Sequence, residues 1–285
     1  MRILGCLLMM GMIFLYPSQT ADAARQALYI FGLDIIPTLF PYMVLTRLLV
    51  TRLNVSSRAS LLFSAIFGCL GGSPSGASMI QLLAANRPMK RRDAYALCAL
   101  TGTISPIFLL NTVGSWLSNT RMTIILTTAH FAGALLAALA VHLYMRNDCR
   151  YTECHSSPAQ FTEDNLILSC AISVLGIGGC LVFYSVLSEV ISLLVFSSES
   201  STSSIMHALF EISGGIREII SHSAPGAKYI LLSIVCGFSG ISILSQNALL
   251  LKRAGISFRL LMLLGILRAS FSAMVMLALL PLYIN

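Results

Sequence analysis

The chain has 285 residues, of which 56% are hydrophobic and only 10% are charged, whereas soluble domains carry roughly 25% charged residues. Its mean hydropathy is +0.85, and this much apolar surface cannot be buried in one soluble core, which excludes an ordinary water-soluble protein. The net charge is +7, and basic residues in a membrane chain are first read as topology signals. We therefore expect an all-α polytopic membrane protein with a lipid bilayer as its surroundings and no nucleic acid partner.

The N-terminal region, residues 1–26, has the pattern of a signal anchor or a signal peptide. An apolar run from Leu4 to Tyr16 follows Arg2 and precedes the small residues Ala21-Asp22-Ala23, which is the order of a secretory signal. In a polytopic chain such a segment is more often retained than removed. The sequence favours a retained anchor and leaves cleavage of residues 1–23 open.

The rest of the chain contains further apolar stretches, each able to cross or nearly cross about 30 Å of hydrocarbon. They cover residues 27–45, 59–86, 94–118, 122–145, 166–196, 229–250 and 258–283. We divide the chain into a first repeat with its connecting helix (27–145), a polar loop (146–165) and a second repeat (166–285). The loop holds Cys149 and Cys154 but no second ligand pair at a recognised spacing, so no metal site and no cofactor are predicted.

The stretch from Leu61 to Leu83 is interrupted by Gly71-Gly72-Ser73-Pro74-Ser75-Gly76. Glycines, serines and a proline free backbone groups that bare lipid cannot satisfy. Basic residues stand on both sides of the break, at 47–58 and at 87–92, and both flanks favour the cytoplasm. We predict a re-entrant helical hairpin with its tip at Gly72.

A second interrupted stretch, residues 229–250, contains Gly237-Phe238-Ser239-Gly240. When Gly68 is aligned with Gly237, Gly71 falls opposite Gly240, which indicates an internal repeat. An odd number of crossings between equivalent points makes the two repeats inverted, the architecture of many secondary transporters. The alternative is a bundle of glycine-kinked helices. We expect about 6–8 hydrophobic segments with two broken or re-entrant hairpins.

The helix after a re-entrant tip directs its positive N-terminus into the membrane, where it can bind an anion. Two adjacent amides at membrane depth are costly without partners, and they can face the same ligand. Hydroxyls from a third interruption, near residues 101–106, either face this cavity or pack between helices. The predicted substrate-binding residues are Gly72, Ser73, Ser75, Gly76, Thr103, Ser105, Gln246 and Asn247.

Two carboxylates inside apolar stretches, Asp34 and Glu211, are candidates for binding a coupling proton or sodium ion. The alternatives are pairing with an arginine or a place at the membrane interface. Catalysis is not expected. The string Gly237-Phe238-Ser239-Gly240 matches the G-x-S-G of rhomboid-type intramembrane proteases, but no histidine follows His222 to act as the base.

Several short strings, in this order and spacing, resemble the YlbJ-type sporulation integral membrane proteins, members of the nucleoside-recognition or gate domain superfamily. The resemblance covers roughly residues 27–283 and rests on Pro37-Thr38-Leu39-Phe40-Pro41, Gly72-Ser73-Pro74-Ser75-Gly76-Ala77, Ser105-Pro106-Ile107-Phe108, Glu211-Ile212-Ser213-Gly214-Gly215-Ile216, and Gly237-Phe238-Ser239-Gly240 with Gln246. Ser73 stands where the family pattern G-Y-P-x-G-A has an aromatic residue, which removes a stacking surface.

The resemblance implies a protein of endospore-forming bacteria, made in the mother cell and placed in the outer forespore membrane. It also implies transport of a small organic anion, with dipicolinate as the expected substrate. The alternatives are a transporter of a nucleoside or related metabolite, and a sporulation membrane scaffold that transports nothing. A second copy of the chain and other sporulation membrane proteins are candidate partners.

Overall fold

The computed structural model describes residues 2–52, 57–86, 89–152, 163–195, 201–223 and 225–281. Within these ranges the chain is helical and forms no β-strand. Among the described residues, 5 helices are long and apolar enough to cross a membrane: Pro17–Leu49, Thr120–Tyr144, Asn165–Leu194, Ala227–Leu251 and Phe258–Leu279. The predicted all-α polytopic class is confirmed.

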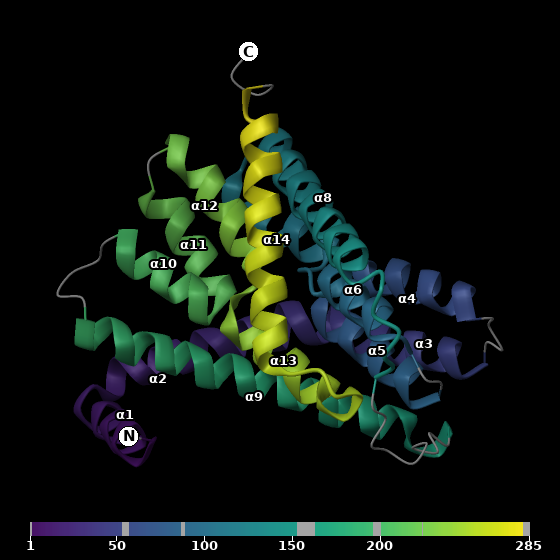
Figure 1. The fold of residues 1–285 in the computed structure, drawn as a ribbon. Coiled ribbons are helices and arrows are strands. Elements are labelled where there is room, and N and C mark those ends of the chain that lie inside the picture. Colours follow the sequence, from purple (N-terminus) through teal and green to yellow (C-terminus); the bar gives the residue numbers. More distant parts are fainter. Residues whose placement is uncertain are drawn as a thin grey trace.

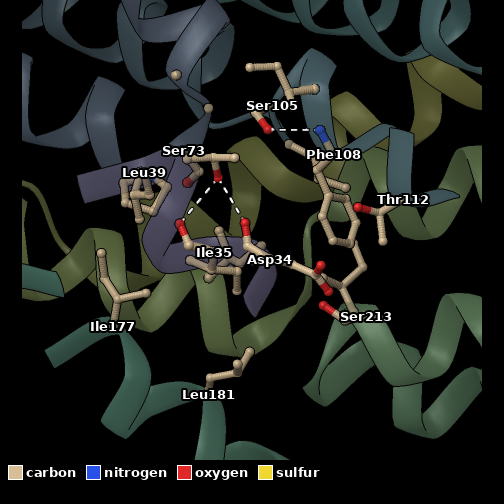
Figure 2. Close-up of a pocket in the computed structure, with 18 of the residues that line it drawn as sticks. Asp34, Ile35, Leu39, Ser73, Ser105, Phe108, Thr112, Ile177, Leu181 and Ser213 are labelled. Atoms are coloured by element: carbon tan, nitrogen blue, oxygen red, sulfur yellow. Dashed lines mark hydrogen bonds between the residues drawn. The ribbon is translucent and has the colours of Figure 1, made fainter. Parts of the chain in front are cut away.

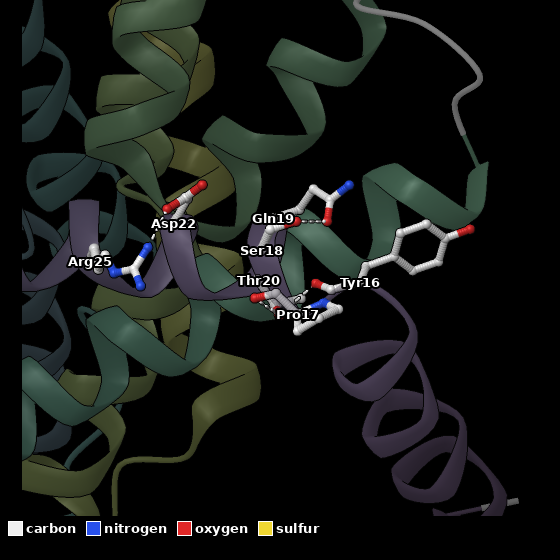
Figure 3. A network of polar contacts seen from close by, with 7 residues as sticks. All are labelled: Tyr16, Pro17, Ser18, Gln19, Thr20, Asp22 and Arg25. Carbon is white, nitrogen blue, oxygen red and sulfur yellow. Dashed lines mark hydrogen bonds and ion pairs between the residues drawn. The ribbon is translucent and has the colours of Figure 1, made fainter.

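The N-terminal helix α1 (Arg2–Leu15) is separated from α2 (Pro17–Ile30) by a break at Tyr16. Proline is well suited to the first turn of α2 because it has no N–H to leave unpaired. The Thr20 hydroxyl donates to the Tyr16 carbonyl at 2.9 Å, and Arg25 pairs with Asp22 at 2.7 Å (Figure 3). The predicted boundary after residue 26 therefore falls inside a helix.

Each half of the chain has a long helix, a hairpin, an interrupted helix and a second long helix, in that order (Figure 1). In the first half, the first long helix consists of α2, the π-helical η1 (Phe31–Ile35) and α3 (Ile36–Arg52). The hairpin consists of α4 (Ser57–Gly71) and α5 (Ser73–Asn86). The interrupted helix consists of α6 (Arg91–Thr101), η2 (Phe108–Val113) and α7 (Gly114–Leu117), and the long helix α8 (Thr120–Tyr144) ends this half. In the second half, α9 (Glu163–Val195) is followed by the hairpin α10 (Ser201–Phe210) and α11 (Ile212–His222), the interrupted helix α12 (Pro225–Phe238) and α13 (Gly240–Leu251), the short η3 (Lys252–Ala254), and α14 (Phe258–Leu279).

The last helices of the two halves, α8 and α14, pack side by side and run antiparallel. Leu126, near the start of α8, clusters with Met276 near the end of α14. Ala137, in the second half of α8, clusters with Leu261 at the start of α14. Equivalent helices of the two halves therefore point in opposite directions.

The first helices of the two halves are arranged in the same way. Arg47 of α3 donates to Ser169 and Ser173 near the start of α9, at 2.9 and 3.2 Å. Phe31, sixteen positions earlier, lies against Gly178 further along α9. Since the element order is shared and both pairs of equivalent helices are antiparallel, the two halves form an inverted repeat, as the sequence predicts.

The alignment that suggested the repeat was wrong in detail. It matched the hairpin α4–α5 with residues 229–250, but the equivalent hairpin is α10–α11 with its tip at Glu211. Residues 229–250 belong to the interrupted helix α12–α13, which corresponds to α6–α7. The misalignment arose because the interruptions at Gly72 and Ser239 are both rich in glycine and serine, whereas the second hairpin tip is formed around a carboxylate.

Candidate functional site

A cavity of about 290 Å3 lies where the two hairpin tips, the first interruption, α13 and the long helical segments η1–α3 and α9 meet (Figure 2). Each half contributes a tip, part of its interrupted helix and a long helix. The lining residues are Leu33, Asp34, Ile35, Thr38, Leu39, Tyr42, Leu70, Gly71, Gly72, Ser73, Pro74, Thr103, Ile104, Ser105, Ile107, Phe108, Asn111, Thr112, Ile177, Leu181, Glu211, Ile212, Ser213, Ile243 and Gln246.

The first hairpin tip reaches the cavity through Gly72, Ser73 and Pro74. Gly72 has a φ of +76°, and a Cβ there would lie 2.8 Å from the backbone nitrogen of Ser105. Only glycine fits this left-handed backbone and this close approach. Ser73 begins α5, and its hydroxyl accepts a hydrogen bond from the Asn247 amide of the other half.

Three predicted site residues stand behind this tip and do not line the cavity: Ser75, Gly76 and Asn247. Ser75 is 1% exposed. Gly76 is pressed against Thr101, whose Cβ would lie 2.5 Å from an added Cβ. Asn247 uses its amide nitrogen on Ser73. In this arrangement these residues support the tip.

The first interruption places Thr103 and Ser105 in the cavity wall. The Ser105 hydroxyl accepts from the Phe108 backbone N–H at 3.2 Å (Figure 2) and so bonds the first residue of η2. Thr103 is fully buried, and within the described chain its hydroxyl has no hydrogen-bond partner. Both π-helical segments, η1 and η2, contribute lining residues, and such segments occur frequently at functional sites.

The second hairpin tip presents Glu211, which is 5% exposed and lines the cavity. Its carboxylate accepts from the backbone N–H groups of Ser213 and Gly214 at 2.9 and 2.8 Å. The N-terminus of α11 is thus capped by a side chain of the protein itself. The N-terminus of α11 is therefore not free to bind an anion while Glu211 caps it.

The two interruptions are joined behind the cavity. The Ser239 hydroxyl donates to the Gly102 carbonyl at 3.1 Å. Arg268 of α14 is 2% exposed and donates from Nε to the Gly237 carbonyl at 3.1 Å, and its guanidinium lies against Gly102. In the other half, His130 of α8 accepts from the Ile104 N–H at 3.1 Å.

Comparison with known proteins finds a relative of this chain. No family model and no solved structure matches the chain. The chain is similar to the sporulation integral membrane protein YlbJ of Bacillus subtilis (strain 168), with 23% identity over an alignment that covers 94% of this chain and 79% of the relative. This match confirms the resemblance to the YlbJ-type sporulation membrane proteins that the sequence motifs indicate. With its long apolar helices, the chain is an integral membrane protein of sporulation.

The wall of the cavity in this chain is acidic. Among the described residues that line it, the ionisable side chains of Asp, Glu, Lys, Arg and His type are Asp34 and Glu211 alone. The Asp34 carboxylate has no hydrogen bond or ion pair within the described chain, although its carbonyl accepts from Thr38 at 2.9 Å. The net charge of +7 therefore does not mean that a ligand in the cavity is surrounded by positive charge.

The remaining predicted site residue, Gln246, lies in the wall and donates to Ser242 at 3.3 Å. Sequence reasoning missed Tyr42, whose ring lies against Gly71 and whose hydroxyl donates to the Phe67 carbonyl. It also gave no role to His130. No spacing in the sequence links these residues to the breaks that they contact.

The polar loop lies partly outside the described residues, which end at Thr152 and resume at Glu163; Cys154 falls in that gap. Hydrogen bonds from Arg150 lower the pKa of Asp148 to about 2. Among the described residues, no group of three His, Cys, Asp or Glu side chains is placed to hold a metal ion.

Proposed function

We propose that this protein transports a small organic anion across the outer forespore membrane, with dipicolinate, an aromatic dicarboxylate, as the first substrate to test. One observation carries the proposal. Equivalent elements of two inverted halves, the hairpin tips and the interrupted helices, line one cavity. Secondary transporters commonly bind their substrates at such a place, and alternating access moves one repeat against the other.

The cavity suits a small molecule with an apolar body and polar ends. Its volume of about 290 Å3 is near the lower end of the range for small-molecule sites. Leu39 and Phe108 supply apolar surface, and the polar groups in the wall include the Thr103 hydroxyl and the Gln246 amide. The N-terminus of α5 adds backbone donors that favour a carboxylate.

The charge of the wall sets a condition on this proposal. Asp34 and Glu211 repel a dianion if both are ionised, because the low dielectric strengthens the repulsion. An anion would then enter together with protons or cations. The same observation favours a second candidate substrate, a neutral nucleoside or related metabolite, which needs no compensating charge.

Flux into liposomes tests the proposal. The purified full chain is reconstituted, and uptake of dipicolinate, uridine and phosphate is compared. We expect selective dipicolinate uptake that Gln246→Leu reduces at least tenfold, because leucine cannot hydrogen-bond a polar ligand in a buried wall. The matched control is Gln19→Leu, an exposed glutamine of α2 outside the cavity, which should retain full uptake.

Uptake of uridine alone would replace the anion with the second candidate. If folded protein moves no solute, and Gln246→Leu supports normal spore formation in cells, the transporter proposal is wrong and a scaffold role replaces it.

A further inference from the structure

The second hairpin carries a pair of titratable side chains outside the cavity. Nδ1 of His207 on α10 and Oε1 of Glu218 on α11 are 2.6 Å apart. A contact this short is typical of a charge-assisted hydrogen bond. The His207 side chain is 17% exposed and the Glu218 side chain 34%, so the pair lies largely inside the protein.

The charged groups around this histidine are all acidic. Glu218 faces it from α11, Glu189 from α9, and Glu211 from the hairpin tip. The helices α12 and α13 also contact α10 but add no charged group to those acting on His207. Three carboxylates with one imidazole give an excess of negative charge, which is costly in a low dielectric unless a proton or cation binds.

This cluster is connected to the cavity through the backbone. The Glu211 N–H donates to the His207 carbonyl at 2.7 Å, and the Glu211 side chain forms part of the cavity wall. Nε2 of His207 is buried and has no partner among the described residues, so Glu218 alone orients the ring through a hydrogen bond.

We propose that His207, Glu218 and Glu189 form a proton-binding site whose occupancy controls anion binding in the cavity; this inference rests on the proposed transport function. A bound proton reduces the negative charge next to the Glu211 wall and favours an anion there. Linkage requires the converse, so a bound anion strengthens proton binding by the same factor. The two ligands then cross together.

Proton-driven uptake is the first measurement. Proteoliposomes holding the full chain receive labelled dipicolinate with and without an inward proton gradient. Coupling to one proton supports about tenfold accumulation for each pH unit of gradient. We expect Glu218→Gln and Glu189→Gln each to lose this stimulation and to keep exchange of internal for external dipicolinate. Asp22→Asn, an exposed acid paired with Arg25 on α2, is the matched control and should behave as the unaltered protein.

A second measurement does not depend on transport. The NMR signal of His207, assigned by its loss in His207→Gln, is titrated in nanodiscs holding the full chain. Its midpoint should move by about one pH unit in Glu218→Gln, as expected for losing one close charge partner, and stay unchanged in Asp22→Asn.

These results separate the two proposals. Dipicolinate uptake that ignores the proton gradient overturns the proton site and leaves the transport proposal standing. If there is no flux but the midpoint moves, transport fails and the proton site is retained as a feature of the hairpin. An unchanged midpoint in Glu218→Gln refutes the site directly.

Discussion

Gly133→Ala should separate the two halves of the protein where α8 crosses α14. A Cβ at this position would lie 2.6 Å from the Ser272 nitrogen, 2.7 Å from its Cα and 2.9 Å from its Cβ. Carbon atoms in contact are normally about 3.5–4.0 Å apart, so the helices must move apart by roughly 1 Å. The atoms that block the new methyl group are mostly backbone, and no change of rotamer can remove them.

The energetic effect follows from two opposing terms. Overpacking of this kind costs about 1–3 kcal/mol, whereas replacing a helical glycine by alanine gains up to about 1 kcal/mol of helix propensity. Gly176→Ala on α9 is the matched control, because an added Cβ there meets nothing within 4 Å. The two variants should differ in free energy of unfolding by about 1–3 kcal/mol.

Thermal or denaturant unfolding in the same micelles measures this difference, and uptake into liposomes measures its functional effect. Helix separation would also disturb the contacts that His130 and Arg268 make with the two interruptions. Gly133→Ala should therefore lose a larger fraction of its uptake than of its free energy of unfolding. Equal stability of Gly133→Ala and Gly176→Ala would refute the close crossing of α8 and α14.

Two further results are expected. Glu211→Ala removes both bonds to the N-terminus of α11 and should lower the free energy of unfolding by about 1–2 kcal/mol; unchanged thermal unfolding would contradict the cap. In a variant free of native cysteines, Ser118→Cys before α8 and Ser257→Cys before α14 should react with membrane-impermeant thiol reagents from opposite faces, because α8 and α14 are antiparallel. Labelling of both positions from one face would exclude the inverted repeat.

The sequence predicted the first hairpin because its cause is local. Glycine, proline and serine interrupt an apolar run at Gly72, and lipid cannot satisfy the freed backbone groups. Gln246 was found for a similar reason, since a buried amide at membrane depth needs a partner. Both residues line the cavity.

What the sequence could not predict depends on contacts between distant residues. Asn247 and Ser73 are 174 positions apart, and only the folded chain shows that Asn247 supports the tip. The acidic wall also emerges only on folding, because it depends on which residues of a basic protein reach the cavity. The sequence marked Glu211 only as a carboxylate in an apolar region, and its equivalence to Gly72 was hidden because a carboxylate cap looks unlike a glycine turn.

The unlike chemistry of the two tips makes the cavity directional. One end presents the Ser73 hydroxyl beside a helix N-terminus, and the other presents a carboxylate that already caps its own helix. A ligand with two different ends would bind in one orientation, and even a symmetric one would meet a different surface from each side of the membrane. Half-saturating concentrations for entry and exit would then differ in the absence of any gradient, with the maximal rates differing in the same ratio so that equilibrium is preserved.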